Sequence, residues 1–196
     1  MWGDIAITFL LAFITTYVFT PYSIRLARKV KALDIPKDKR KIHKKIMPRL
    51  GGIAIVAGFL VSAIYLIIAM IIEKKLDIFT NNYYIKLIGF LLGIIVLEVF
   101  CYFDDTKGIK PIVKLIGQII AATLVVSSGI VIDKILETSS TSLLSNEIFL
   151  KIFTVFWIVG ITNAINLLDG LDGLSSGVSL ISSICLMFIF ILNSSP

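Results

Sequence analysis

Apolar residues occur along the 196-residue chain in six long runs separated by short polar segments. The runs cover residues 4–27, 49–72, 84–103, 111–131, 147–166 and 175–193. A helix needs about 20 apolar residues to cross the hydrocarbon core of a bilayer, and each run is close to that length. The pattern therefore predicts an all-α, polytopic membrane bundle of about six transmembrane helices, with residues 1–196 forming a single membrane domain.

The composition agrees with a membrane protein. Hydrophobic residues make up 57% of the chain and charged residues only 16%, which is not typical of a soluble globular domain. No basic segment precedes the first apolar run, so we interpret that run as a retained span and not as a cleaved signal. We expect the membrane to be a partner and expect no nucleic-acid partner.

Basic residues set the predicted orientation. Eleven of the 19 Lys and Arg residues lie between Arg25 and Arg49, and short loops rich in these residues stay in the cytoplasm. The N-terminus is then outside, as are the connections near 73–83 and 132–146. The connections near 104–110 and 167–174 are inside. One basic and two acidic clusters are therefore expected at the cytoplasmic face.

The basic cluster extends from Asp34 to Gly52. It has two interpretations: a positive-inside anchor against anionic lipid headgroups, or a binding site for a polyanion. The second is favoured because His43 lies within the basic run and the glycine pair Gly51-Gly52 is placed to open a helix. Backbone N–H groups at such a helix start can approach a phosphate closely. The side chains expected to assist are Arg40, Lys41, His43 and Arg49.

The first acidic cluster is Asp104-Asp105, where the third run meets water, with Pro111 at the expected first turn of the next helix. Two adjacent carboxylates repel each other unless a cation relieves them, and Mg²⁺ is commonly held by one or two carboxylates together with substrate phosphates. Solvated charges at a helix end are the alternative. Glu98 lies about two turns inside the third run; it is either functional or a neutral, snorkelling or interhelical group, and we leave it out of the site.

The second acidic cluster is the stretch NAINLLDGLDGL. Its polar residues recur at intervals of three: Asn163, Asn166, Asp169 and Asp172. One straight helix cannot direct all of them to one site, because each step of three falls about 60° short of a full turn. Gly170 and Gly173 allow the helix to end near Leu168, with both aspartates on a tight turn. Interhelical asparagine bonds and an Asp-Gly turn are the alternatives, and each explains only half of the stretch.

Together these motifs resemble the polyprenyl-phosphate N-acetylhexosamine-1-phosphate transferases of glycosyltransferase family 4. The family acts in peptidoglycan, teichoic acid and surface-polysaccharide synthesis. The first motif contains Asp34, Arg40, Lys41, His43, Pro48, Arg49, Gly51 and Gly52. The second contains Asp104, Asp105, Pro111, Lys114 and Gln118, and the third is the stretch from Asn163 to Leu174. The first motif is more similar to the N-acetylglucosamine-1-phosphate branch than to the muramoyl-pentapeptide branch.

The resemblance implies transfer of a sugar 1-phosphate from a UDP-sugar to undecaprenyl phosphate, with release of UMP. It implies Mg²⁺, or Mn²⁺ in its place, as the cofactor. Asp104 would orient or deprotonate the lipid phosphate, Asp105 would lie at the metal and Lys114 would hold a phosphate. Asn166 and Asp169 would recognise uridine or support the metal, with Asn163 and the catalytic candidate Asp172 in the same pocket. The metal ligands implied are thus Asp105, Asp104 and Asn166.

Family members continue beyond the sixth span with a Gly-Asp-x-Gly-Ser-type element and a loop that bears histidine or arginine. We therefore expect this chain to be the N-terminal part of that fold, in the membrane of a bacterial cell with its active face cytoplasmic. A homodimer is left open. The alternative function is a non-catalytic fragment or assembly partner that binds lipid phosphate. A transporter is disfavoured because the polar groups gather at one face and not at the midplane.

Overall fold

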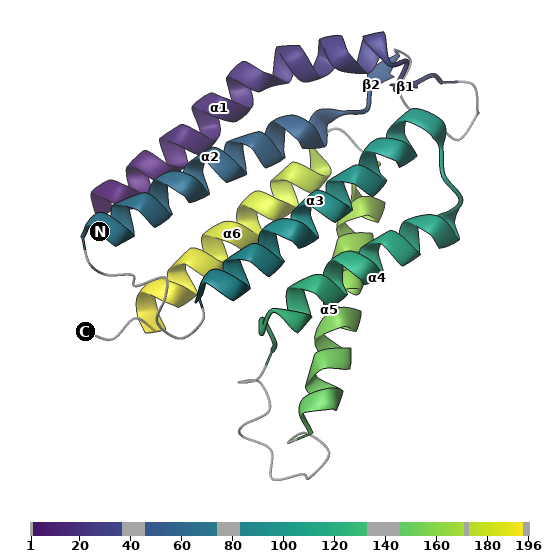
Figure 1. The fold of residues 1–196 in the computed structure, drawn as a ribbon. Helices are drawn as coiled ribbons and strands as arrows, with labels where there is room; N and C mark the ends of the chain where they lie inside the picture. Colours follow the sequence, from purple (N-terminus) through teal and green to yellow (C-terminus); the bar gives the residue numbers. More distant parts are fainter. Residues whose placement is uncertain (1, 37–45, 74–82, 133–145, 171–172, 194–196) are drawn as a thin grey trace. The chain divides into compact units, whose positions relative to one another are not determined.

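The computed structural model describes residues 2–36, 46–73, 83–132, 146–170 and 173–193 (Figure 1). Within these residues eight elements follow one another: α1 (Trp2–Lys29), β1 (Leu33–Asp34), β2 (Met47–Pro48), α2 (Gly51–Ile72), α3 (Tyr83–Lys107), α4 (Pro111–Ser127), α5 (Glu147–Leu168) and α6 (Leu174–Asn193).

The prediction of a helical, polytopic membrane bundle is confirmed. Within the described residues, five helices are long and apolar enough to cross a membrane, and α4 is a shorter apolar helix. The α4 helix ends at Ser127, earlier than the expected 131, because Gly129 takes a left-handed backbone conformation with φ of 94°. The two short strands were not expected. They pair antiparallel, with Leu33 opposite Pro48 and Asp34 opposite Met47.

The chain divides into two compact units, Met1–Ile130 and Val131–Pro196. In the first unit, α1 and α2 run side by side (Figure 1). Gly58 of α2 makes this close packing possible. A Cβ added there would collide with the Thr16 side chain and would lie 2.8 Å from the Ala12 carbonyl oxygen, both in α1. Small residues at such contacts let membrane helices approach closely, where dispersion forces can hold them together.

The helices α3 and α4 form the second close pair in this unit. Gly89 and Gly93 of α3 lie against the last turns of α4, and a Cβ at Gly93 would be 3.1 Å from the Ala121 carbonyl oxygen. Gly117 of α4 gives space to the ring of Phe100 in α3. Because each helix supplies glycine to the other, the α3–α4 turn at their shared end is held between two tightly packed helices.

The second unit contains α5 and α6. The α5 helix begins at a side-chain cap, in which Asn146 Oδ1 accepts a hydrogen bond of 2.9 Å from the Ile148 amide. The buried Thr154 hydroxyl joins this helix to the preceding segment. It accepts a 3.0 Å hydrogen bond from the Ile132 amide and donates one of 2.8 Å to the Leu150 carbonyl.

Candidate active site

The end of α1 and the start of α2 are joined by a small buried cluster of Ala27, Ala32 and Leu50, called the clamp below. After Lys29 the chain turns through Lys31, which has a φ of 61°, and the Ala32 amide donates back to the Ala27 carbonyl at 2.9 Å. This left-handed turn with a hydrogen bond across the helix end is a common way to close a helix. It directs the chain into β1, whose pairing with β2 returns it to α2.

Leu50 is the central apolar residue of this clamp. Its side chain is buried with Ala27 and Ala32, and Tyr102 of α3 packs against the same cluster. Its carbonyl accepts a 2.5 Å hydrogen bond from the Ser23 hydroxyl in α1. The residue immediately before Leu50 is therefore held at a defined place beside α3.

That residue is Arg49. Its amide donates to the Ala32 carbonyl at 3.1 Å, and its side chain forms an ion pair with Asp34, with 2.9 Å between Nη2 and Oδ1. The Arg49 side chain remains 41% exposed, so a ligand can reach it. Asp34 and Arg49, which lie 15 positions apart in the first motif, are therefore in direct contact.

The acidic pair lies inside the last turns of α3. The helix continues to Lys107 and then ends at Gly108, which has a φ of 66° and donates its amide to the Asp104 carbonyl at 2.9 Å. Pro111 then opens α4, as expected, because its missing N–H costs nothing at a helix start. The short turn brings Lys114 back to Asp104, with 2.9 Å between Nζ and Oδ2.

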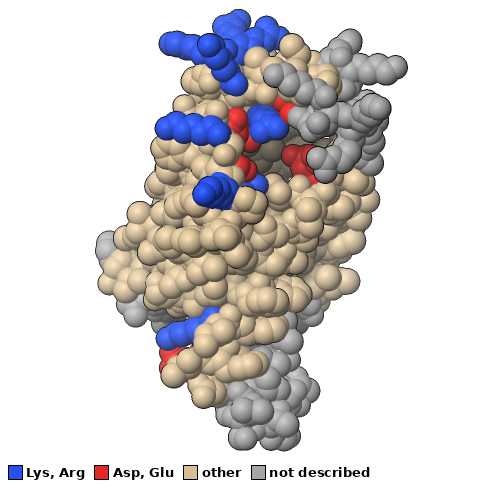
Figure 2. All heavy atoms as spheres, turned by 90° about the vertical axis from the view of Figure 1, so that its right-hand side faces the viewer, with Lys and Arg blue, Asp and Glu red and all other residues tan. Residues whose placement is uncertain are grey.

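Asp105 is half-buried and has no hydrogen bond or ion pair with the residues that the structure describes. Four charged side chains act on it electrostatically: Arg49 most strongly, then Asp104, Lys114 and Glu98. The first and second motifs are therefore brought together at one end of the first unit. Figure 2 shows Lys and Arg side chains gathered at the upper end of one face, with carboxylates among them.

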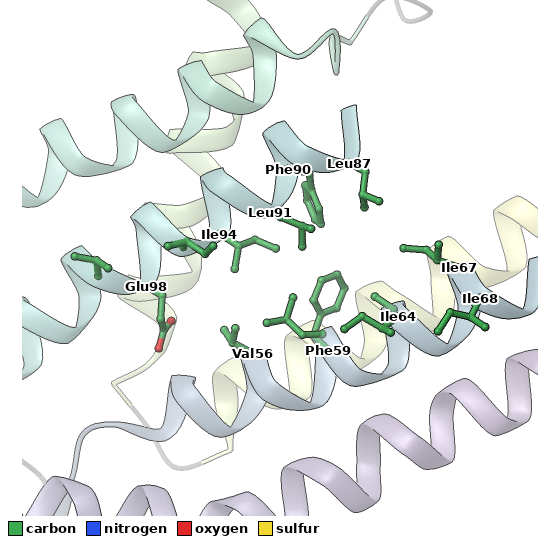
Figure 3. Close-up of a pocket in the computed structure, with 14 residues that line it drawn as sticks. Val56, Phe59, Ile64, Ile67, Ile68, Leu87, Phe90, Leu91, Ile94 and Glu98 are labelled. Carbon is green, nitrogen blue, oxygen red and sulfur yellow. The ribbon is translucent and has the colours of Figure 1, made fainter. Parts of the chain in front are cut away.

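Glu98 lies at the end of an apolar groove between α2 and α3. The groove has a volume of about 600 Å³, and Glu98 is the only ionisable residue among the described residues that line it. Figure 3 shows Glu98 on α3 directed toward α2, near Val56, with apolar side chains along the rest of the groove. A Cβ added to Gly52 would lie 3.9 Å from both Glu98 carboxylate oxygens.

This position changes the interpretation of the glycine pair. Gly51 and Gly52 do open α2, as expected, and α2 has no acidic residue in its first turn and no side-chain cap. Glu98 places a carboxylate beside that turn, where the helix dipole favours negative charge. The sequence marked Glu98 as unusual but could not place it beside Gly52, because 46 residues separate the two positions.

The third motif belongs to the second unit. The α5 helix ends at Leu168, so the predicted helix end is confirmed. Gly173 takes a left-handed conformation with φ of 78°, while residues 171–172 of the predicted turn lie outside the described residues. Asn163 lies one turn before Asn166 and donates to the Val159 carbonyl at 2.9 Å. Asp169 is exposed at the end of the helix. The predicted roles of these three side chains stay predictions.

Four predicted site residues lie outside the described residues: Arg40, Lys41, His43 and Asp172. Their expected contacts with a polyanion or with the acidic pocket stay predictions.

The acidic pair can be tested as part of a metal site from its donor atoms. Among the described residues, no three His, Cys, Asp or Glu side chains lie close enough together to hold a metal ion by themselves. Asp104 is bonded to Lys114, which leaves Asp105 as the available carboxylate. One carboxylate fits the usual binding of Mg²⁺, which takes further oxygen ligands from water and substrate phosphates. Asp105 alone does not supply a complete set of protein ligands for the ion.

Sequence comparison identifies the family. The profile of glycosyl transferase family 4 matches residues 87–196, which is more than half of the chain. The chain belongs to glycosyl transferase family 4. The matched segment contains the acidic pair, Lys114 and the whole third motif, and therefore includes the α3–α4 turn and the end of α5.

Curated proteins match over 65% to 93% of the chain. A probable undecaprenyl-phosphate N-acetylglucosaminyl 1-phosphate transferase of Bacillus subtilis is 38% identical over 189 residues, which cover 93% of this chain and 48% of that protein. A phospho-N-acetylmuramoyl-pentapeptide-transferase of Lactobacillus gasseri is 30% identical over 182 residues, 90% of this chain and 56% of that protein. A decaprenyl-phosphate N-acetylglucosaminephosphotransferase of Mycobacterium leprae is 30% identical over 129 residues, 65% of this chain and 30% of that protein.

The chain spans about half the length of the first two of these relatives. No solved structure matches it significantly.

Proposed function

We propose that this family 4 chain takes part in the transfer of N-acetylglucosamine 1-phosphate, or a related N-acetylhexosamine 1-phosphate, from a UDP-sugar to a polyprenyl phosphate such as undecaprenyl phosphate. The reaction would take place at the cytoplasmic face of a bacterial membrane, at the start of cell-wall or surface-polysaccharide synthesis. The names of the relatives support a polyprenyl phosphate as the acceptor and an N-acetylhexosamine 1-phosphate as the transferred group. The 38% identity to the Bacillus subtilis protein favours N-acetylglucosamine.

One observation carries the proposal: two basic side chains and the acidic pair meet at one end of the first unit. Arg49 acts electrostatically on Asp105, and the Lys114 ammonium forms an ion pair with Asp104. A reaction between two phosphates needs cationic groups to bring the anions together and carboxylates to bind a cation or accept a proton. These two kinds of group adjoin here at the end of apolar helices, where a membrane-anchored phosphate would be expected.

In the proposed reaction, an oxygen of the lipid phosphate attacks the phosphorus attached to the sugar. The bond from that phosphorus to the oxygen of UMP breaks, and UMP leaves. Arg49 and Lys114 would bind phosphate oxygens, and Asp104, released from Lys114 by the arriving phosphate, would orient or deprotonate the acceptor. Asp105, with phosphate oxygens of the donor, would hold Mg²⁺, or Mn²⁺ in its place. The ion would neutralise negative charge during phosphoryl transfer.

The test uses membranes that contain the chain, labelled UDP-N-acetylglucosamine and undecaprenyl phosphate. Because the chain spans about half of its relatives, the assay is run with the chain alone and with the second half of the Bacillus subtilis relative supplied as a separate polypeptide. We expect Mg²⁺-dependent formation of UMP and labelled lipid in at least one of these assays. Asp105→Asn should remove at least about 99% of it, the scale of loss when a group that stabilises transferring charge is removed.

Glu73→Gln is the matched control, because it removes a carboxylate at the opposite end of α2. It should leave the rate unchanged. If neither assay forms UMP while the complete Bacillus subtilis relative does so under the same conditions, the proposed reaction is wrong for this chain. Lipid binding without turnover, unchanged by Asp105→Asn, would instead support the non-catalytic alternative.

A further inference from the structure

The ion pair between Asp34 and Arg49 connects the two-stranded hairpin to the acidic pair. The backbone of Arg49 is held on both sides, because its amide donates a hydrogen bond to the Ala32 carbonyl and the residue that follows it, Leu50, is buried. Its side chain is long and has many rotamers, so a fixed backbone alone does not place the guanidinium. Among the described residues, Asp34 is the side chain that hydrogen-bonds to it.

This contact leaves most of the guanidinium available. An arginine side chain has five N–H donors, and the bond to Asp34 is made through Nη2. The side chain is 41% exposed, whereas that of Asp34 is 22% exposed. Arg49 is also the charged side chain that acts most strongly on Asp105. The guanidinium is therefore held at the hairpin while its charge acts on the acidic pair of α3.

We propose that Asp34 is a positioning residue, which holds the Arg49 guanidinium beside Asp105 so that it can receive a phosphate oxygen of either substrate. The proposal rests on the proposed function for the identity of the phosphate. Preorganising a flexible cation lowers the entropy lost when the anion binds. Asp34 is not a catalytic residue in this scheme, since its proposed effect on the phosphate is exerted through Arg49.

The direction in which neutralising Asp34 changes anion affinity shows whether Asp34 positions Arg49 or only lies near the anion site. A carboxylate that only lies near an anion site repels the anion, so its neutralisation would tighten binding. A carboxylate that positions the arginine has the opposite effect. Asp34→Asn should weaken binding by about two- to fivefold, the range expected for an exposed ion pair. Asp34→Glu, which keeps the charge, should restore part of the affinity.

The binding experiment uses the chain in phosphatidylcholine nanodiscs, titrated by calorimetry with farnesyl phosphate and separately with UDP. The two titrations show whether Arg49 binds the lipid phosphate or a phosphate of the nucleotide. Asp34→Asn is measured alone and in the Arg49→Ala background, because a residue that acts only through Arg49 has no further effect once that side chain is removed. Tighter binding in Asp34→Asn, or an equal loss in both backgrounds, would overturn the proposal.

A second measurement does not depend on binding or turnover. Phenylglyoxal modifies free guanidinium groups, and the rate at Arg49 can be followed by mass spectrometry. Asp34→Asn should raise the rate at Arg49 and leave it unchanged at Arg25, whose guanidinium lies 5.6 Å from the Tyr22 ring centroid. An unchanged rate at Arg49 would also overturn the proposal. If the rate rises but UMP is never formed, Arg49 is held by Asp34 and the proposed reaction is wrong.

Discussion

At the residue scale, the charges of the site are arranged as linked pairs. Arg49 is bonded to Asp34 in the hairpin, and Lys114 is bonded to Asp104 across the α3–α4 turn. All four residues stand out in the sequence motifs, and the family resemblance implies that Lys114 holds a phosphate and that Asp104 acts on the acceptor. The structure adds that these two side chains bond to each other, so a phosphate bound by Lys114 would replace a carboxylate.

Replacing Lys114 by methionine tests this pair. The change leaves Asp104, whose side chain is only 26% exposed, without the ammonium partner at 2.9 Å. We expect the rate of UMP formation to fall by about tenfold to a hundredfold, because a hydrogen bond between charged groups contributes about 1.5–3 kcal/mol. Lys114→Arg should retain a measurable rate.

The matched control is Lys110→Met, which removes the same charge from the exposed residue just before α4. Its effect should stay within about twofold, as expected for a solvated surface charge. Equal losses in the two variants would mean that the total positive charge of the turn matters and that the contact with Asp104 does not.

At the element scale, glycines determine how closely the helices of the first unit pack. Gly58 gives α1 and α2 their close approach, while Gly93 and Gly117 do the same for α3 and α4. These contacts fix how α1 packs on α2 and how α3 packs on α4, the helices from which the hairpin and the α3–α4 turn extend. Sequence periodicity could predict the helices, but it could not identify which glycines lie at helix contacts. Gly160 is equally central in its helix, yet among the described residues no atom beyond its own helix lies within 4 Å of its Cβ position.

Gly58→Ala and Gly160→Ala form a matched pair of variants. The added methyl group at position 58 meets the Thr16 side chain and a backbone carbonyl of α1. We expect it to lower the free energy of unfolding by about 1–3 kcal/mol, the usual cost of overpacking. Gly160→Ala should leave stability unchanged or raise it by up to about 1 kcal/mol, because alanine favours the helix. Unfolding in mixed detergent micelles measures both, and equal changes would contradict the packing described for α1 and α2.

At the scale of the whole molecule, orientation in the membrane decides which clusters can share a site. The concentration of Lys and Arg before Arg49 predicts that this end of the first unit is cytoplasmic. The same end holds the hairpin, the acidic pair and the α3–α4 turn. An inverted topology would leave the site on the outer side of the membrane, away from the UDP-sugar of the proposed reaction.

Single cysteines report this orientation. In a variant without Cys101 and Cys185, a cysteine at Lys110 should react with a membrane-impermeant maleimide only after the cells are permeabilised. A cysteine at Asn146, the cap of α5, should react on intact cells. The reverse pattern would overturn the predicted topology, and with it the cytoplasmic site.

The sequence by itself determined the features that depend on neighbouring residues. These are the apolar helices, the start of α2 at Gly51, the start of α4 at Pro111 and the end of α5 at Leu168. Each follows from hydrophobic length or from the backbone preferences of glycine and proline, which act over a few residues. The family motifs were visible for the same reason, since each lies within a short stretch.

Only the tertiary structure decided which side chains of different motifs meet. It placed Arg49 where its charge acts on Asp105, bonded Lys114 to Asp104, and brought the Glu98 carboxylate beside Gly52. These relationships depend on how α1 and α2 pack, how α3 and α4 pack, and how the clamp contacts Tyr102. Local preferences carry no information about such contacts, because their energy comes from close packing and charge between residues far apart in the chain.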